Sequence, residues 1–263
     1  MLDTHTIPKE AWGVYPYLHV GPFVVPSYSL CVTAGVLIGI WLYFDEIRRS
    51  NSASQHTPLI LIVSFVGGIL GAKLPYLAWN VSLYLHGVRD PEILFSGRTI
   101  LGGLIGGTLA VRLVKWRLNL YARKGDYLVP GIAAGLVFGR IGCFLRGCCC
   151  GTETLLPWGI NFGDGIRRHP TELYEAAFCL AWFIYARLQT KTDTGRMFDR
   201  FMLSYFAARF LLEFIRTESV AFAGLTLFQL VCLPVICWVL HKLINPQPQW
   251  THPTQNNQTH ANT

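Results

Sequence analysis

The sequence predicts an all-α fold, a polytopic membrane helix bundle of about seven transmembrane helices. Hydrophobic residues make up 52% of the 263 residues and charged residues only 14%, whereas a soluble domain is about 25% charged. The mean hydropathy is +0.36. Apolar runs of about 20 residues, the length that a helix needs to cross a bilayer, recur along the chain. The net charge of +7 does not indicate a nucleic-acid partner, because the basic residues lie mostly between these runs.

Seven apolar runs are candidates for spanning helices. In order they are Val25–Phe44, Pro58–Trp79, Thr99–Val114, Tyr127–Leu145, Leu173–Leu188, Phe198–Ile215 and Leu225–Leu243. The third and fifth are shorter than the others. We therefore expect residues 1–244 to form a single transmembrane domain with a small extracytoplasmic part. The first twenty-odd residues lack the basic start and apolar core of a cleaved signal peptide. The polar segment 245–263 is rich in Pro, Asn and Gln, which predicts disorder.

Basic residues are distributed unevenly between the two ends of the predicted helices. The segments after the first, third and fifth runs and the C-terminal flank hold twelve: Arg48, Arg49, Arg112, Lys115, Arg117, Arg123, Lys124, Arg187, Lys191, Arg196, Arg200 and Lys242. The opposite side holds five: Lys9, Arg89, Arg98, Arg167 and Arg168. Because basic residues accumulate on the cytoplasmic side, we expect a multi-pass protein of the bacterial inner membrane. Its N-terminus should lie outside and its C-terminus in the cytoplasm.

The second, third and fourth runs are rich in glycines spaced four residues apart. The sets are Gly67 and Gly71, Gly102 and Gly106, Gly103 and Gly107, and Gly131, Gly135 and Gly139. Small residues at this spacing let a neighbouring helix approach closely, so helix packing is the favoured interpretation. The stretch LGGLIGG is dense enough in glycine to allow a ligand to approach the backbone as well.

Charged residues also fall within or beside the apolar runs. They are Lys73, Arg140, Arg146, Glu172, Glu175, Arg209, Glu213 and Arg216. A charge at mid-bilayer costs at least about 2.5–3.5 kcal/mol on insertion scales, so these side chains need partners or a ligand. Arg209 and Glu213 can pair on one helix face. Arg140 has no acid nearby in sequence, and we expect it to be unpaired and to hold a lipid phosphate in a membrane cavity.

The stretch RRHPTELYEAAF, residues 167–178, carries a second group of polar residues. Thr171 is a candidate cap for the helix, with Glu172 and Glu175 in its first turn, where the helix dipole favours acids. The functional alternative is a polar cluster at the outer membrane face. In that case His169 and Tyr174 line one cavity together with the intramembrane arginines.

Four of the eight cysteines fall in the stretch GRIGCFLRGCCCG, residues 139–151: Cys143, Cys148, Cys149 and Cys150. The others are predicted to be small hydrophobic side chains. The sequence leaves four interpretations of the cluster open: packing, a zinc site with His169, a disulfide to another part of the chain, or a reactive thiol. The spacing is not a standard zinc pattern.

The motifs together resemble the prolipoprotein diacylglyceryl transferase family. The resemblance rests on GRIGCFLRGCCCG, RRHPTELYEA and YFAARFLLEFIR in that order, with GGLIGG before them and SYSL in the first run. The resemblance implies a seven-span enzyme that transfers the diacylglyceryl group of phosphatidylglycerol to a cysteine thiol in a lipoprotein signal peptide. The product is a thioether, and glycerol phosphate leaves. No cofactor or metal is implied, and the partners are phosphatidylglycerol, prolipoprotein signal peptides and membrane lipid.

The same resemblance assigns expected roles to individual residues. It implies catalytic roles for Arg140, Arg209, His169 and Tyr28. The expected substrate-binding residues are Arg140, Gly151, Gly102, Gly103, Tyr174, Glu213, Arg216, Arg146 and Cys143. Two arginines would hold the headgroup phosphate and stabilise charge on the departing glycerol phosphate.

The sequence departs from the family pattern at four positions. Leu101 stands where the family has a histidine, Cys143 and Arg146 replace asparagines, and Cys148 replaces a glutamate. If the histidine is the base that activates the acceptor thiol, this chain must use another group or another acceptor. Two alternative functions therefore stay open. One is a membrane thiol-redox or metal-handling protein that uses the cysteine cluster, and the other is a non-catalytic lipid-binding homologue.

Overall fold

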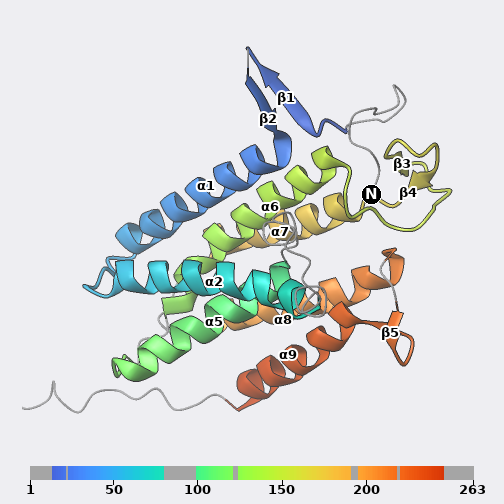
Figure 1. Cartoon of the computed structure of the whole chain (residues 1–263). Coiled ribbons are helices and arrows are strands. Elements are labelled where there is room, and N and C mark those ends of the chain that lie inside the picture. The colour runs from blue at the N-terminus through green and yellow to red at the C-terminus, as the bar shows by residue number, and fades with distance from the viewer. Residues whose placement is uncertain are drawn as a thin grey trace, which may run out of the picture.

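The computed structural model describes residues 14–21, 23–79, 99–120, 124–190, 195–217 and 220–245. Seven long helices make up most of this part of the chain (Figure 1). They are α1 (Ser27–Arg49), α2 (Thr57–Trp79), α5 (Ile100–Arg117), α6 (Val129–Arg146), α7 (Thr171–Leu188), α8 (Arg196–Leu212) and α9 (Leu227–Ile244). Each helix coincides with one predicted apolar run, so the positions and order of the predicted helices are confirmed.

Several helix boundaries differ from the predicted ones for local reasons. Helix α1 begins at Ser27 because Pro26, which precedes it, is extended and belongs to a strand. It ends only at Arg49, and acids in its last turns pair with Arg187 of α7. Short 3-10 helices extend α6 at its start, η1 (Lys124–Leu128), and α8 at its end, η2 (Glu213–Ile215).

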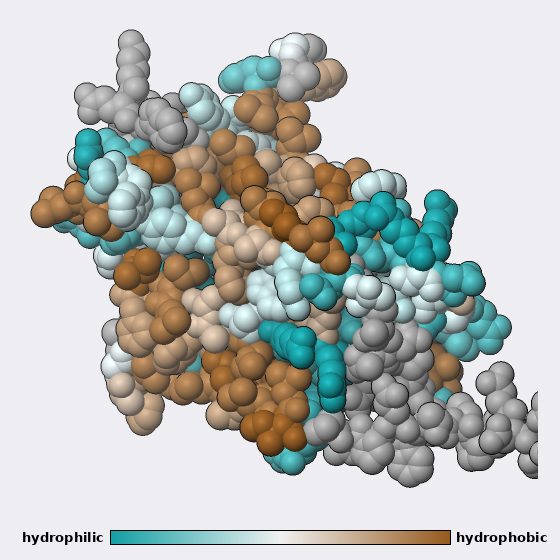
Figure 2. Space-filling model, turned by 180° about the vertical axis from the view of Figure 1, so that it is seen from behind, coloured by the Kyte–Doolittle hydropathy of each residue, from teal (hydrophilic) through white to brown (hydrophobic). Residues whose placement is uncertain are grey.

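Apolar side chains cover much of the outer surface of the bundle, as expected for a protein in lipid (Figure 2). Among the described residues, four helical segments are long and apolar enough to cross a membrane: Ser27–Arg49, Thr57–Leu77, Lys124–Arg146 and Leu227–Ile244. The chain is therefore a helical membrane protein. The remaining long helices, α5, α7 and α8, are 17 or 18 residues in length.

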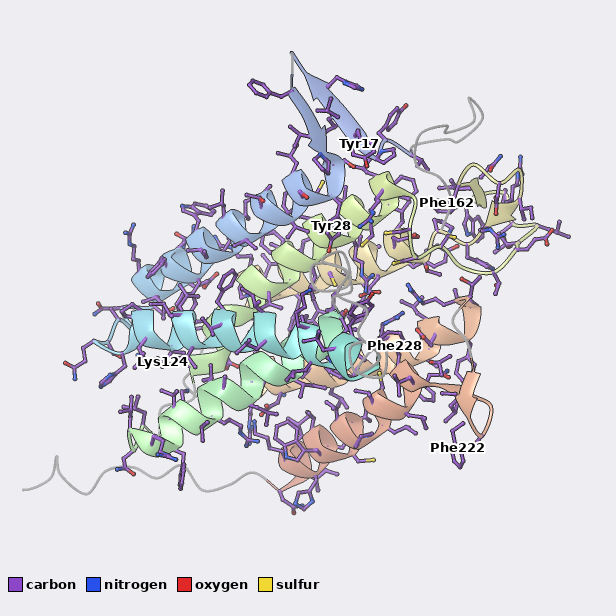
Figure 3. The ribbon with its side chains drawn as sticks, in the orientation of Figure 1. Tyr17, Tyr28, Lys124, Phe162, Phe222 and Phe228 are labelled. Carbon is purple, nitrogen blue, oxygen red and sulfur yellow. The ribbon has the colours of Figure 1, made fainter. Side chains whose placement is uncertain are left out.

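Three small antiparallel hairpins add strands that the all-α prediction did not include. They pair β1 (Tyr17–Val20) with β2 (Phe23–Pro26), β3 (Ile160–Asn161) with β4 (Arg167–Arg168), and β5 (Val220–Phe222) with β6 (Leu225–Thr226). Gly21 and Gly224 adopt left-handed backbone angles, φ 60° and 78°, that let the chain reverse in the first and third hairpins. In Figure 3, Phe162 and Phe222 lie at one end of the bundle and Lys124 at the other.

The helices associate in closely packed pairs, in which glycines of one helix face glycines of the other. A Cβ on Gly39 of α1 would lie 3.0 Å from the carbonyl oxygen of Gly131 on α6. Between α2 and α5 the approach is closer, because a Cβ on Gly71 would lie 2.3 Å from the carbonyl oxygen of Gly102. The predicted role in helix packing is confirmed for most of the spaced glycines, but a Cβ on Gly139 would meet no atom within 4 Å.

Replacing Gly71 with alanine should lower the melting temperature of the purified protein by about 2–12 °C, because the added methyl group forces α2 and α5 apart. Gly68 provides a matched control on the same helix. A Cβ there would meet the Gly103 carbonyl oxygen at 3.6 Å, an ordinary contact. Gly68→Ala should therefore unfold at or slightly above the wild-type temperature, since alanine favours helix. Equal melting temperatures for the two variants would contradict this packing.

The end of the bundle opposite the hairpins carries most of the predicted cytoplasmic basic residues. Lys242 of α9 pairs with Asp199 of α8 there. Lys124 donates a hydrogen bond to the Ser52 carbonyl oxygen between α1 and α2. The basic residues Lys9, Arg89, Arg98, Arg123 and Lys191 lie outside the described residues, as does the predicted disordered tail after Asn245.

Candidate active site

Arg140 forms a buried ion pair with an acid from another helix. Its Nη2 donates a hydrogen bond to Glu175 Oε1 at 2.6 Å, and Tyr205 Oη of α8 donates to the same oxygen at 2.5 Å. Arg140 is 6% exposed and Glu175 2%. The prediction that Arg140 is unpaired was wrong, because its partner is 35 positions away and reaches it only when α6 packs against α7. Tyr205 was missed, although it lies one helical turn before Arg209.

Arg209 forms a second buried ion pair, and this one was predicted. Its Nη2 lies 2.8 Å from Glu213 Oε2, one turn along the same helix. Glu213 also accepts a hydrogen bond from Thr226 Oγ1 at 3.0 Å. The Arg209 guanidinium stands 5.4 Å from the ring of Phe228, at the start of α9 in Figure 3. Helices α8 and α9 therefore fix the second arginine from both sides.

The two buried arginines retain hydrogen-bond donors that the protein does not use. Arg140 Nε, Arg209 Nε and Arg209 Nη1 have no hydrogen-bond partner among the described residues. Buried donors are almost always satisfied in native proteins. Arg209 is also close enough to Arg140 and to Arg216 for each of their positive charges to repel its own. An anion between the guanidinium groups would satisfy the donors and relieve this repulsion.

A cavity of about 1240 Å³ runs between the helix pairs α1–α6 and α2–α5 and extends to α8 and α9. Of the predicted site residues, Tyr28, Gly103 and Cys143 line it. Its walls are mostly apolar side chains and glycines, and Lys115, Lys124 and Lys242 lie in its lining toward the opposite end of the bundle. Neither Arg140 nor Arg209 is among the lining residues, although Gly139 beside Arg140 is.

Gly102 and Gly151 are both enclosed by backbone. Gly102 packs against Gly71 of α2 and does not line the cavity. A Cβ on Gly151 would lie 2.6 Å from the Ile215 carbonyl oxygen and 2.7 Å from the His169 Cβ. The loop that begins at Gly147 is therefore held between the start of α7 and the end of α8.

His169 and Tyr174 lie together, but away from the large cavity. His169 Nδ1 is 3.2 Å from Tyr174 Oη, which also accepts a hydrogen bond from Trp158 Nε1 at 2.8 Å. Tyr174 lines a separate pocket of about 1000 Å³ with residues of the β3–β4 hairpin. Neither of these two pockets is lined by both this pair and the intramembrane arginines, so the expectation that they share one cavity stays a prediction.

Thr171 does not cap α7 as predicted. It is the first residue of the helix, and Pro170 occupies the cap position without a side-chain hydrogen bond. Thr171 Oγ1 instead donates to the Cys149 carbonyl oxygen at 2.9 Å. Arg216 Nη1 donates to the same oxygen at 3.2 Å. The cysteine loop is thus fixed by α7 and by the segment after α8. The exposed Arg146 stands 5.8 Å from the ring of Tyr28.

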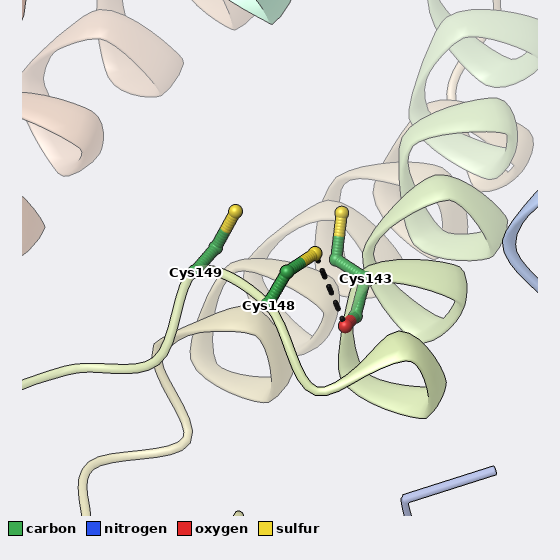
Figure 4. Close-up of side chains that lie close together, drawn as sticks. All are labelled: Cys143, Cys148 and Cys149. Carbon is green, nitrogen blue, oxygen red and sulfur yellow. Dashed lines mark hydrogen bonds between the residues drawn. The ribbon is translucent and has the colours of Figure 1, made fainter. Parts of the chain in front are cut away.

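Three thiols converge at the end of α6. The sulfur atoms of Cys143, Cys148 and Cys149 lie within 4.8 Å of one another (Figure 4). All eight cysteines lie in described residues, and each is a free thiol. His169 is not part of this group. Hydrogen bonds with Cys143 and Cys148 lower the pKa of the Cys149 thiol, and the positive charges of Arg216 and Arg140 act in the same direction.

Comparison with known proteins decides the family. The family model for prolipoprotein diacylglyceryl transferase matches residues 16–244. The chain belongs to the prolipoprotein diacylglyceryl transferase family. It is 35% identical over 247 residues to a protein of Nitratidesulfovibrio vulgaris strain DP4, and the matched region covers 84% of this chain and 91% of that relative. It is 33% identical over 204 residues to a protein of Clostridium tetani, and the matched region covers 73% of this chain and 81% of that relative. Both relatives are named phosphatidylglycerol–prolipoprotein diacylglyceryl transferase.

Leu101 stands where the resemblance implies a histidine, and it packs against apolar side chains. It is 3% exposed and belongs to a buried cluster with Met202, Tyr205 and Phe206. An aliphatic side chain cannot accept a proton, so Leu101 cannot be the base that the resemblance places at this position. Cys143 and Cys148, two of the three converging cysteines, also stand where the resemblance implies other residues.

Proposed function

We propose that this chain transfers the diacylglyceryl group of phosphatidylglycerol to the lipobox cysteine of prolipoproteins, forming a thioether and releasing glycerol phosphate. Its family membership over residues 16–244 and the activity named for its relatives support this reaction. The observation that carries the proposal is the pair of buried arginines with unused donors beside a large apolar cavity.

The cavity fits the two acyl chains of a membrane lipid. Ligand pockets commonly enclose about 300–1,000 Å³, and this one is larger, at about 1240 Å³. Gly35, Gly39, Gly103 and Gly107 contribute no side chain to its wall, which leaves room for the acyl chains. A lipid seated here brings its headgroup toward the end of α6, near Gly139 and Cys143.

The arginines fit the phosphate end of the same lipid. Guanidinium groups hold phosphate through paired hydrogen bonds. Arg140 and Arg209 come from different helices and retain unused donors. As the bond between the glyceryl carbon and the phosphate oxygen breaks, negative charge grows on the departing glycerol phosphate. Fixed positive charges lower the barrier to that step.

The membrane topology in this proposal has seven spans, the N-terminus outside and the C-terminus in the cytoplasm of a bacterium. The basic end of the bundle supports this orientation. Leu155, 97% exposed, and the exposed Ser50 lie at opposite ends of the bundle. In a background in which the exposed Cys149 and Cys237 are replaced by serine, a membrane-impermeant maleimide should label Leu155→Cys in intact spheroplasts and should label Ser50→Cys only after lysis. The reverse labelling pattern would overturn the orientation.

The reaction itself is tested by mass spectrometry of the acceptor. Purified protein is incubated with vesicles that contain phosphatidylglycerol and with a lipobox peptide. We expect the peptide to gain the mass of one diacylglyceryl group, and a peptide with serine in place of the cysteine should gain none. Phosphatidylglycerol binding without any product would favour the non-catalytic alternative and exclude the transferase.

A further inference from the structure

The thiols of Cys143, Cys148 and Cys149 form a compact group that has no role in the steps proposed for the arginines and the cavity. Cys143 lies in the last turn of α6, and the other two follow in the loop. Their sulfur atoms lie within 4.8 Å of one another, on the same side of the loop in Figure 4. Simple packing does not require three thiols to converge, and a disulfide would use only two of them.

The backbone holds these thiols in place at some energetic cost. Gly147 ends α6 with a left-handed φ of 71°, and Cys149 follows with a φ of 72°. A residue other than glycine in this region costs about 1 kcal/mol or more and persists only where its surroundings fix it. The hydrogen bonds from Thr171 and Arg216 to the Cys149 carbonyl oxygen provide that constraint.

The surroundings complement a metal–thiolate centre. Three thiolates and a zinc ion carry a net charge of −1, which the nearby Arg140 and Arg216 offset electrostatically. Glu172, at the start of α7, is 0% exposed, and neither of its carboxylate oxygens has a hydrogen-bond partner among the described residues. It is close enough to Cys149 for their negative charges to repel each other. A cation bound among the thiols would relieve this repulsion.

We propose that Cys143, Cys148 and Cys149 bind a zinc ion whose fourth position takes the thiolate of the acceptor cysteine. Catalytic zinc sites commonly have three protein ligands and one open position, with zinc–sulfur distances of about 2.3 Å. This inference rests on the proposed function. The zinc ion would activate the acceptor thiol, which Leu101 cannot do. A zinc site here replaces the expectation from the sequence that the reaction uses no metal.

The step is balanced without any redox chemistry. The acceptor thiol releases its proton as its sulfur binds zinc. The sulfur then forms a bond to the glyceryl carbon, while the bond from that carbon to the phosphate oxygen breaks. The electron pair leaves with the glycerol phosphate, which takes up the proton directly or through water. Cys143 lines the cavity one turn beyond Arg140, so the nucleophile and the phosphate clamp lie at the same place.

The first test measures metal in the intact protein. After incubation with Zn²⁺ and removal of loosely bound ions, we expect about one zinc per chain. A Cd²⁺-loaded sample should show thiolate-to-metal absorption in the ultraviolet. Each of Cys143→Ser, Cys148→Ser and Cys149→Ser should weaken zinc binding by at least about 10- to 100-fold. Cys150→Ser is the matched control from the same loop and should bind zinc like the wild type. A wild-type protein that retains no zinc would overturn the site.

The second test measures transfer. Removing zinc with excess chelator should lower the transfer rate at least about 10-fold, and adding Zn²⁺ should restore it. Undiminished transfer by the zinc-free protein or by Cys143→Ser would overturn the role of zinc and leave the proposed function intact. A folded, zinc-loaded protein that makes no thioether would contradict the proposed function, and the catalytic role of zinc with it, whereas the metal measurements would stand.

Discussion

Replacing Arg140 with glutamine should lower the rate of diacylglyceryl transfer by at least about 100-fold. The buried guanidinium follows Gly139, which lines the cavity, and removing one such charge from a site commonly costs about 100- to 1,000-fold in rate. Initial rates of thioether formation, measured by mass spectrometry, test this. The loss should appear mainly in kcat, because the charge on the leaving group grows in the transition state.

This substitution also breaks a buried ion pair, which alone can cost about 3–5 kcal/mol of stability. The double variant Arg140→Gln with Glu175→Gln removes both charges and should fold better than the single variant while staying inactive. Arg187→Gln is a matched control. It breaks an ion pair with Glu46 at the opposite end of the bundle and should keep most of the transfer activity. Wild-type rates in the double variant would exclude Arg140 from the chemistry.

Replacing Arg209 with lysine should also lower transfer by about 100-fold, although the positive charge is kept. Nη2 of Arg209 pairs with Glu213, so Nε and Nη1 remain as hydrogen-bond donors for an anion. A lysine has a single ammonium group and cannot serve both partners in this geometry. Transfer rates across a series of phosphatidylglycerol concentrations measure the effect. If Arg209 binds the headgroup, the KM for phosphatidylglycerol should rise and kcat should fall.

Thr226→Val is the control for Arg209→Lys. It removes the hydrogen bond to Glu213 and the N-cap hydrogen bond of α9, and it leaves the guanidinium in place. It should lower stability by about 2–3 kcal/mol and change the transfer rate far less than Arg209→Lys does. Similar losses of activity in the two variants would show that Arg209 only supports the fold.

The sequence predicted the long helices because the membrane imposes a strong and local pattern. Each apolar run is close to the length that crosses lipid. The glycine pairs were predictable for the same reason, because glycines four residues apart on one helix form a flat face. Helix ends were less predictable. The last turns of α1 pair with Arg187, which is far away in the chain, and the strands of the hairpins are only two to four residues long.

The candidate site was predictable only where its partners lie on one helix. The Arg209–Glu213 pair follows from an i,i+4 spacing. The Arg140–Glu175 pair joins two helices, and nothing in the local sequence indicates it. The thiol group was equally hidden, because C-x4-C-C does not match a standard zinc spacing. Its three sulfurs meet because the chain turns sharply through left-handed Gly147 and Cys149.

The central claim, that Arg140 and Arg209 hold the lipid phosphate at the head of the cavity, is tested most directly by a structure in bilayer discs made with phosphatidylglycerol. We predict density for the headgroup phosphate within about 3 Å of Arg140 Nε and of Arg209 Nε or Nη1, with the acyl chains between the α1–α6 and α2–α5 pairs. Headgroup density elsewhere, with both guanidinium groups bonded only to their acids, would contradict the claim.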